Sequence, residues 1–277
     1  NVDDILEDAD GYLWIHTSRG YCVFNPMTET FERDMNVWLK KYNIHGSVNN
    51  VYIDKYKNRW IVVSGKGCYF ISKKDNSVFL FKYGKKGAQT IPNGNINAFT
   101  EFKRSVLIIY SDGKFVSLNG NGRRRQWTDS YISRKSTHDQ GYNLFTDRDC
   151  NYYISSNGNF YVYMQNKHRW YSSLADMLRD FNIVPPSGNI LVKNVKQDKY
   201  GNLWIATDHK GVIVINIKVR YLKSYYYDKD NINSIPDNTQ QSILIDNNST
   251  VWIGTYKNGV AYYSDYIKKF QLIPLGD

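Results

Sequence analysis

Apolar and polar residues alternate along the chain in short segments that recur at a regular spacing. Each segment places an aromatic or aliphatic residue before Ile, and Gly and Asn bound most of them. Alternating runs of this length between turn residues are typical of short β-strands joined by tight turns. The pattern predicts an all-β chain made of repeated units. The six segments are 11–17, 59–61, 106–108, 152–154, 201–207 and 251–255.

Six anchor residues set the register of the repeat: Trp14, Trp60, Leu107, Tyr153, Trp204 and Trp252. They recur every 46 to 51 residues, which is the period of propeller blades. Positions not used in the alignment support it, because Ile follows every anchor and a Gly lies five to seven residues later. Six residues before the anchors stand acidic residues: Asp8, Asp54, Glu101, Asp147, Asp198 and Asp246.

Each unit contains four strand-like runs separated by turn signals. In the last unit these are 241–245, 251–255, 260–263 and 269–273. Consecutive hairpins of this length form a four-stranded antiparallel sheet, and such sheets bury their faces by packing against one another. We therefore expect residues 1–277 to form a single β-propeller, with the recurrent Trp and Ile residues packed between neighbouring blades.

Two stretches depart from the strand pattern. Leu174, Met177, Leu178 and Phe181 follow helical spacing, and Ser173 with Asp176 forms a capping pair. These residues predict one short helix inserted between the fourth and fifth units. A second, weaker helical turn is expected at 37–39.

Composition and charge restrict the classes of protein to which the chain can belong. The chain has 277 residues, is 42% hydrophobic and carries a net charge of +10, so we expect a folded protein with a basic surface or an anionic partner. Its apolar runs are too short to span a membrane, and we expect it to be a portion of a larger protein. Basic residues at 123–125 beside Trp127 are consistent with an outer edge strand, and no nucleic-acid-binding signature is present.

The candidate chemical groups favour structural roles. A carboxylate that recurs once per unit at the same offset is expected to accept backbone N–H bonds in a turn, because catalysis needs two carboxyls tuned apart. The His residues have no metal-ligand spacing, and we expect no metal and no cofactor. Cys22 and Cys68 share one offset in consecutive units and are expected to be small buried apolar residues, whereas Cys150 lies in a turn. The odd number of cysteines argues against a disulfide framework.

Segments 5–20, 195–211 and 243–259 resemble the two-component-regulator propeller repeat, and 233–238 is similar to its usual lead-in. The resemblance implies the periplasmic sensor region of Bacteroides-type hybrid two-component systems, which detect oligosaccharides. It also implies a propeller that is usually seven-bladed, a second propeller and further sensor domains as partners, a homodimer of the full-length receptor, and membrane attachment only through parts absent here.

The ligand of a propeller usually sits on the face that bears the loops between second and third strands and between blades. The expected binding residues on that face are His16, Arg19, Trp38, His45, Lys66, Tyr142, His209, Lys210, Tyr256 and Lys257. Aromatic rings there would stack on sugars, and Arg and Lys would hold carboxylate or sulfate groups. The net charge slightly favours an acidic glycan fragment.

Two other classes of function remain open. A propeller glycoside hydrolase or polysaccharide lyase would need an unrepeated pair of catalytic groups, and Asp3 with Asp4 is the one such acidic pair near a first strand. A protein-interaction scaffold without a small ligand is the other alternative. The sequence favours a non-catalytic sensor module; the full-length protein is expected to carry a histidine kinase elsewhere.

Overall fold

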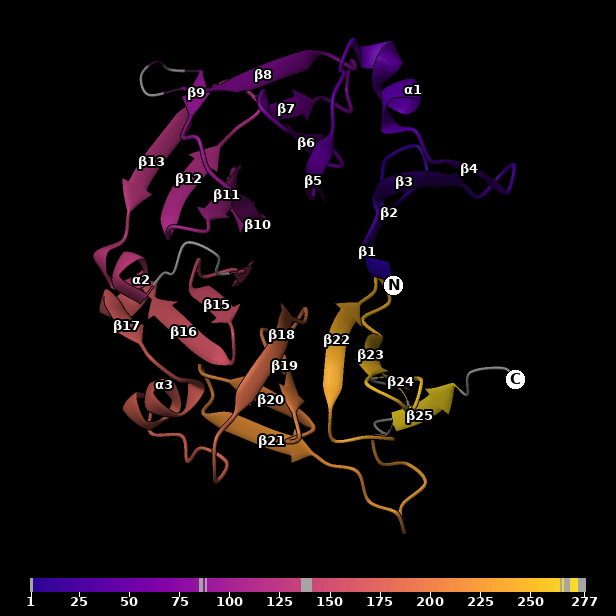
Figure 1. Cartoon of the computed structure of the whole chain (residues 1–277). Helices are drawn as coiled ribbons and strands as arrows, with labels where there is room; N and C mark the ends of the chain where they lie inside the picture. Colours follow the sequence, from indigo (N-terminus) through magenta and orange to yellow (C-terminus); the bar gives the residue numbers. More distant parts are fainter. Residues whose placement is uncertain are drawn as a thin grey trace. The chain divides into compact units, whose positions relative to one another are not determined.

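The computed structural model describes residues 2–84, 87, 89–135, 141–264, 266 and 270–273. The chain divides into two compact units, Asn1–Gln140 and Gly141–Asp277. Each unit contains three sheets that follow one another along the chain (Figure 1). The fold is an all-β propeller with six blades in the described residues, one blade for each sequence repeat, as the sequence predicts.

Unit 1 contains the first three blades. The first blade consists of β1 (Val2–Glu7), β2 (Leu13–Thr17), β3 (Gly20–Asn25) and β4 (Thr30–Glu32). The second blade consists of β5 (Val48–Ile53), β6 (Arg59–Val63), β7 (Gly67–Ile71), β8 (Val78–Tyr83) and β9 (Thr90–Ile91). The third blade consists of β10 (Ile96–Phe102), β11 (Ser105–Tyr110), β12 (Lys114–Leu118) and β13 (Arg124–Thr128).

Unit 2 contains the last three blades. The fourth blade consists of β14 (Asn143–Thr146), β15 (Tyr152–Ser156), β16 (Asn159–Met164) and β17 (Arg169–Tyr171). The fifth blade consists of β18 (Leu191–Gln197), β19 (Leu203–Asp208), β20 (Val212–Asn216) and β21 (Tyr221–Tyr225). The sixth blade consists of β22 (Gln240–Ile245), β23 (Val251–Thr255), β24 (Val260–Tyr263) and β25 (Phe270–Ile273).

Strand order follows chain order in every blade, and the pairs of β1–β4 and their equivalents are antiparallel. The strands expected in the last repeat are confirmed within one residue at their starts, although residue 269 lies outside the described part. The second blade departs from the expected four strands, because the short β9 joins its outer edge in parallel with β8. The basic residues Arg124 and Arg125 lie on β13, the outermost strand of the third blade, as predicted.

The repeated Trp and Ile residues point to opposite sides of their blade. In the second blade Trp60 packs into a cluster with the third blade, whereas Ile61 packs into a cluster with the first. In the fifth blade Trp204 packs against the sixth blade and Ile205 against the fourth. Alternate residues of a strand face opposite sides of a sheet. The core of each unit therefore lies between neighbouring blades, which confirms the expectation.

The repeated carboxylates hold the first turn of five blades together. Asp54 illustrates the arrangement: Oδ1 accepts hydrogen bonds from the backbone N–H of Tyr56 and Asn58, both at 2.9 Å. Its Oδ2 accepts a hydrogen bond from Nε1 of Trp60 at 3.0 Å. We call this arrangement the Asp–Trp clasp. The other clasps pair Asp8 with Trp14, Asp198 with Trp204 and Asp246 with Trp252, and Asp147 with the hydroxyl of Tyr153.

The predicted inserted helix is α3 (Leu174–Asp180), whose N-cap Ser173 accepts a hydrogen bond from the backbone N–H of Asp176. Its apolar face packs into the core between the fourth and fifth blades. The second predicted helical turn is α1 (Met35–Leu39), which continues into η1 (Lys40–Tyr42). The sequence pattern did not predict two further helical segments, α2 (Ser130–Lys135) and η2 (Gln165–Lys167).

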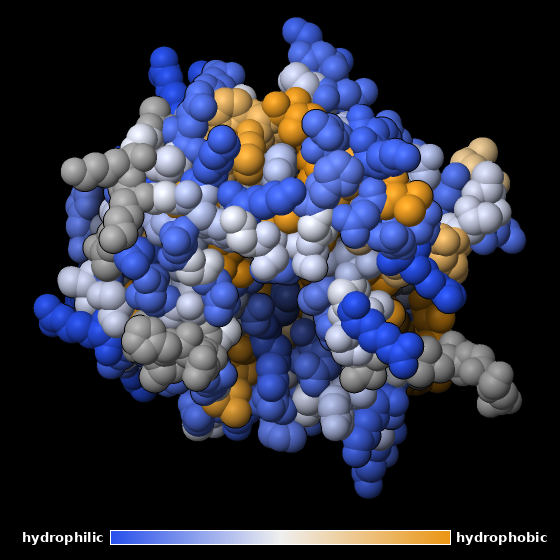
Figure 2. Space-filling view, turned by 45° about the horizontal axis from the view of Figure 1, so that its top comes forward, coloured by the Kyte–Doolittle hydropathy of each residue, from blue (hydrophilic) through white to orange (hydrophobic). Residues whose placement is uncertain are grey.

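Hydrophilic residues cover most of the surface visible in Figure 2, and apolar residues show as separate patches between them. In the part of the chain that the structure describes, no helix combines the length and apolarity needed to cross a membrane. The three cysteines are free thiols, and burial raises the pKa of Cys68. Cys68 therefore behaves as a small core residue, as expected.

Candidate functional site

Each blade has two edges that can carry a site. The first-turn edge bears the turns between first and second strands and between third and fourth strands. The second-turn edge bears the turns between second and third strands and the connections between blades. Nine of the ten predicted binding residues belong, by topology, to turns or connections of the second-turn edge, and His16 lies on β2 near that edge.

In unit 1 the predicted residues are spread over separate turns. His16 lies on β2, its ring stacks on Tyr21 with centroids 4.5 Å apart, and its Nδ1 is 3.9 Å from Asp3. Arg19, His45 and Lys66 are exposed. Among the described residues, no hydrogen bond or ring contact joins Arg19, His45 or Lys66 to another predicted residue.

Trp38 does not lie with these residues. Helix α1 carries its ring to the first-turn edge, where it packs on Trp14 with centroids 4.4 Å apart and on Tyr12 at 6.4 Å. The connection that contains α1 therefore folds along the side of the blade instead of staying at the second-turn edge.

In unit 2 the structure brings several predicted residues together around Thr239. His209 Nδ1 lies 3.0 Å from Thr239 Oγ1, and its Nε2 lies 3.2 Å from Asp208. The backbone N–H of Tyr256 donates to the carbonyl of Thr239, and the Lys257 ammonium lies over the Tyr256 ring. Tyr142, in contrast, is buried, with 3% of its surface exposed.

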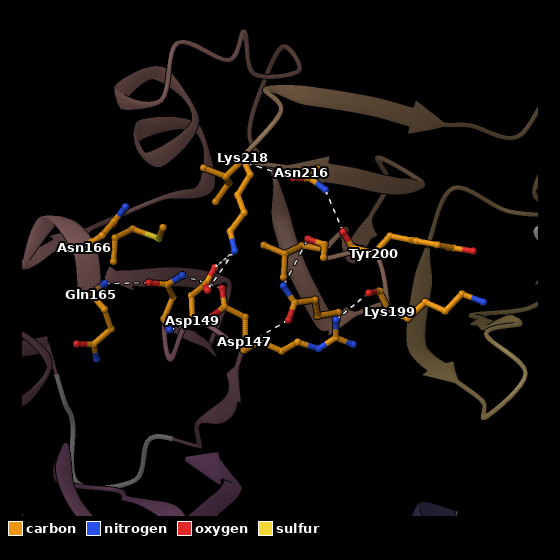
Figure 3. A pocket seen from close by; sticks show the side chains of 15 residues that line it. Asp147, Asp149, Gln165, Asn166, Lys199, Tyr200, Asn216 and Lys218 are labelled. Atoms are coloured by element: carbon orange, nitrogen blue, oxygen red, sulfur yellow. Dashed lines mark hydrogen bonds and ion pairs between the residues drawn. The ribbon is translucent and has the colours of Figure 1, made fainter. Parts of the chain in front are cut away.

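A cleft of about 640 Å³ lies at the first-turn edge of unit 2, between the fourth and fifth blades (Figure 3). Its walls come from the first turns of both blades, from η2, and from the turn after β20. Sequence reasoning missed this cleft because it looked at the second-turn edge. A usable signal was present: the residue after the repeated acid is basic in three units, at Lys55, Arg148 and Lys199.

The base of the cleft is built by the clasp of the fourth blade. Asp147 Oδ1 accepts the backbone N–H of Asn151 at 2.9 Å, and Oδ2 accepts the Asn151 amide at 2.8 Å and the Tyr153 hydroxyl at 2.9 Å. Burial raises the pKa of Asp147, although these hydrogen bonds act in the opposite direction. Because its oxygens are occupied by the blade itself, Asp147 has a structural role.

Polar contacts tie the two walls together across the cleft. The Arg148 backbone N–H donates to Oε1 of Gln197 at 3.0 Å, and its guanidinium Nη1 donates to the carbonyl of Lys199 at 2.9 Å. Lys218 reaches across to Asp149, with Nζ 2.9 Å from Oδ2 (Figure 3). The hydrogen bond that the Lys218 ammonium donates to Asp149 raises the pKa of Lys218. These contacts fix the width of the cleft.

The remaining groups give the cleft its binding character. Gln165 and Asn166 line one wall from η2, and Lys199 and Tyr200 line the opposite wall with their side chains directed away from Asp147 and Asp149 (Figure 3). Met164 and Ile217 add apolar lining. Amides, an ammonium and an aromatic ring around a small apolar floor suit a ligand with many hydroxyl groups. Both carboxylates of the cleft, Asp147 and Asp149, are engaged, so the arrangement differs from an acid–base pair.

The two other candidate chemistries have little support from the geometry. Asp4 Oδ1 accepts the backbone N–H of Ile5 at 2.9 Å, while Asp3 faces His16, so the Asp3–Asp4 pair is divided between two local roles. Within the described ranges, no three His, Cys, Asp or Glu side chains are grouped to hold a metal ion.

Comparison with known proteins gives the class of the repeats. Residues 1–19 and 185–209 match the two-component regulator propeller family. The two matched segments lie at the beginning of the first and of the fifth blade. A comparison with curated protein sequences gives no match.

Solved structures similar to this chain include extracellular domains and a lyase. The extracellular domain of BT3049, described as a hybrid two-component system of B. thetaiotaomicron, is 18% identical with a TM-score of 0.64, and the match covers 100% of this chain and 35% of that one. The extracellular domain of BT4673 of the same organism, described as a one-component system, is 17% identical with a TM-score of 0.61, and 95% and 33% are covered.

A virginiamycin B lyase from Staphylococcus aureus is 11% identical with a TM-score of 0.61, and the match covers 99% of this chain and 84% of that one. At these identities the similarity shows the fold. The chain spans about a third of the length of the two B. thetaiotaomicron domains.

Proposed function

We propose that the chain is a non-catalytic, extracytoplasmic sensor module of a hybrid two-component system, and that it binds an oligosaccharide. The match of two repeats to the two-component regulator propeller carries this proposal. The extracellular domains of BT3049 and BT4673, which share the fold, support the extracytoplasmic location. Signalling would then involve further domains of the receptor, and a periplasmic location follows if those domains include a membrane helix.

The use of the carboxylates supports a binding function over a catalytic one. Five of the six repeated acidic residues hold their own first turn and the neighbouring indole or phenol. A glycosidase needs two carboxyls of different pKa on either side of one bond. These carboxylates are instead hydrogen-bonded parts of the scaffold.

We place the oligosaccharide in the cleft between the fourth and fifth blades. Hydroxyl groups of a sugar would bond to the amides of Gln165 and Asn166, and the Lys199 ammonium would attract a carboxylate or sulfate. The group around His209 and Tyr256 at the second-turn edge is the alternative surface for the same ligand, as expected from the sequence.

Paired variants test the function and distinguish the two surfaces. Asn166→Ala with Lys199→Ala removes polar groups from the cleft without touching a clasp, and His209→Ala with Lys210→Ala is the matched change at the second-turn edge. Calorimetric titration with an oligosaccharide panel should show at least tenfold weaker binding for the cleft variant and unchanged binding for the other, with equal melting temperatures. The reverse result would move the site, and no binding by the wild-type protein would refute the function.

An interaction scaffold is the second candidate function. It is favoured by exposed apolar residues in the connection before β22, where Ile232 is 94% exposed and Tyr227 is 51% exposed. Exposed apolar residues that cluster on a surface often mark contacts with other proteins. A flat response across the oligosaccharide panel together with a stable protein complex would favour this function.

A further inference from the structure

A second pocket, of about 490 Å³, lies in unit 1 at the junction of the first and second blades. It opens at the first-turn edge and is lined by residues from the first turn of the first blade, from η1, and from the turn between β7 and β8. The lining residues are Asp10, Lys41, Tyr42, Asn43, Asn76 and Val78. They combine charge, amides and an aromatic ring in one concave site, which is the composition of a pocket for a polar ligand.

A buried arginine fixes the wall of this pocket. Arg59 is 1% exposed, and it is the one charged residue at the position before the anchors, where the other units have Leu13, Val106, Tyr152, Leu203 and Val251. Its Nε donates to Oδ2 of Asp8 at 3.0 Å, and its Nη2 forms an ion pair with the same oxygen at 2.9 Å. Its Nη1 donates to the Tyr42 hydroxyl at 3.3 Å, and Nη2 donates to Asp10.

Burial of a guanidinium is costly unless it is fully paired. The pairs with Asp8, Asp10 and Tyr42 satisfy this requirement, and they hold Asp10 and Tyr42 in position at the pocket. Arg59 thereby makes this junction a rigid polar site.

A cluster of aromatic rings adjoins the pocket through its lining residues Lys41 and Tyr42. The Trp38 ring is 5.6 Å from that of Tyr42 and 6.4 Å from that of Tyr12, measured between centroids. The ammonium of Lys41 rests on these rings, 4.2 Å from the centroid of Trp38, 5.0 Å from Tyr42 and 5.9 Å from Tyr12.

The ammonium of Lys41 rests on aromatic rings and is available to pair with an anionic ligand. Among the described residues it makes no ion pair within 4.0 Å, and its ammonium contacts rings that attract cations through their π faces. Burial lowers the pKa of Lys41, and the nearby Arg59 lowers it further. An anion from a ligand would therefore gain a charge-assisted hydrogen bond at this position.

We propose that this pocket binds a sugar unit that carries a carboxylate or a sulfate. The ligand anion draws Lys41 away from the indole and pairs with its ammonium. The uncovered faces of Trp38 and Tyr42 then receive the apolar C–H face of the sugar ring, and Asp10, Asn43 and Asn76 bond to its hydroxyl groups. This inference rests on the proposed function, because it assumes an oligosaccharide ligand, and it adds a second subsite and the ligand's charge.

The test compares Lys41→Met with Lys40→Met, which changes an exposed neighbouring lysine of the same charge. Each protein is titrated calorimetrically with tetrasaccharides of galacturonate, chondroitin sulfate and heparin, and with neutral galactan and arabinan tetrasaccharides. We expect Lys41→Met to weaken binding of an acidic tetrasaccharide at least tenfold and Lys40→Met to leave it unchanged. Trp38→Ala should abolish the change in tryptophan fluorescence that accompanies binding, whereas Trp127→Ala should retain it.

The outcomes separate the two proposals. Acidic tetrasaccharide binding that is equal in wild type and Lys41→Met overturns this inference and leaves the sensor function standing. Binding of only neutral tetrasaccharides does the same. Absence of binding to every member of the panel overturns both, and a Lys41→Met effect that persists when Asn166 and Lys199 are replaced by Ala supports a site separate from the cleft.

Discussion

The indole Nε1 of Trp60 donates a hydrogen bond to Oδ2 of Asp54 at 3.0 Å, and both side chains are buried. The acid and the anchor of the repeat are thus joined directly, six residues apart, across the first hairpin of the blade. The third blade shows the alternative. Its anchor is Leu107, and Glu101 instead accepts the backbone N–H of Lys55 in the second blade at 2.6 Å. The same acidic position therefore either closes its own turn or links two blades.

The clasp should contribute measurably to stability. Trp60→Phe keeps an aromatic ring in the core but removes the N–H donor, so we expect the free energy of unfolding to fall by about 2–4 kcal/mol from the lost charged hydrogen bond and the lost packing. Urea denaturation measures this change. Trp127→Phe on β13 is the control, since Trp127 stacks on Phe115 without a clasp, and its cost should be smaller. Equal costs for the two variants would show that the hydrogen bond contributes nothing.

Asp147 and Asp246 occupy the same repeat position but should titrate in opposite directions. Burial raises the pKa of Asp147, whereas the hydrogen bond from Trp252 lowers that of Asp246 from its usual 3.8. NMR titration of the side-chain carboxyl carbons measures both values. Finding both on the same side of 3.8 would contradict the explanation by burial and hydrogen bonding.

The two shifts have opposite consequences for stability. A carboxyl whose pKa is raised by folding stabilises the fold below its unfolded pKa, and this stabilisation is lost as pH rises through its folded pKa. Asp147→Asn should therefore make the free energy of unfolding depend less on pH in this range. A carboxyl whose pKa is lowered by folding stabilises the fold above its unfolded pKa, and this stabilisation is lost as pH falls through its folded pKa. Asp246→Asn should therefore reduce the loss of stability in acid. Urea midpoints measured from pH 3 to pH 7 check both signs.

Removal of the buried guanidinium should destabilise unit 1. Arg59→Leu leaves the fully buried Asp8 carboxylate without its cation, and we expect a loss of about 3–5 kcal/mol in the free energy of unfolding. Arg19→Leu, in an exposed turn, is the matched control and should change stability by less than about 0.5 kcal/mol. Chemical denaturation measures both. If Arg59→Leu were neutral, the apolar residues of the other repeats would be equally suited to this junction.

Gly211 should be far less replaceable than Gly20, although both follow their anchors in the second turn. Both have positive φ, at 64° and 104°. A Cβ at Gly211 would lie 2.0 Å from the Tyr225 carbonyl oxygen, while one at Gly20 would meet nothing within 4 Å. We expect Gly20→Ala to cost about 1–2 kcal/mol from backbone strain alone and Gly211→Ala to cost more. Thermal unfolding of both variants checks the order, and a reversed order would contradict it.

The fold was largely predictable because the repeat constrains it six times. Trp14, Trp204 and Trp252 share one offset from an acid and one from Ile, and a Gly follows each by six or seven residues, so a single unit predicts the others. The Asp–Trp hydrogen bond itself was missed, since the alignment gives a spacing and not a direction. Strand β9 and helix α2 were also missed, because they occur once and no other repeat supports them. The Asp129 side chain, which accepts the N–H of Tyr131, was the available signal for α2.

The candidate sites were less predictable, because they depend on residues that differ between blades. Sequence reasoning favoured the second-turn edge, whereas both clefts lie at the first-turn edge. Trp38 was chosen for its aromatic ring, but only the path of α1 shows that it stands beside Lys41. Arg59 breaks the apolar pattern at its repeat position, and this single exception in the sequence marks the pocket in unit 1.

Calorimetric titration of the wild-type protein with the acidic and neutral tetrasaccharides, followed by analysis of the recovered sugars, tests the proposed sensor function most directly. We predict saturable binding of an acidic tetrasaccharide and recovery of every sugar intact. New reducing ends or unsaturated uronate would show turnover and contradict a non-catalytic sensor, and a complete absence of binding would contradict an oligosaccharide ligand.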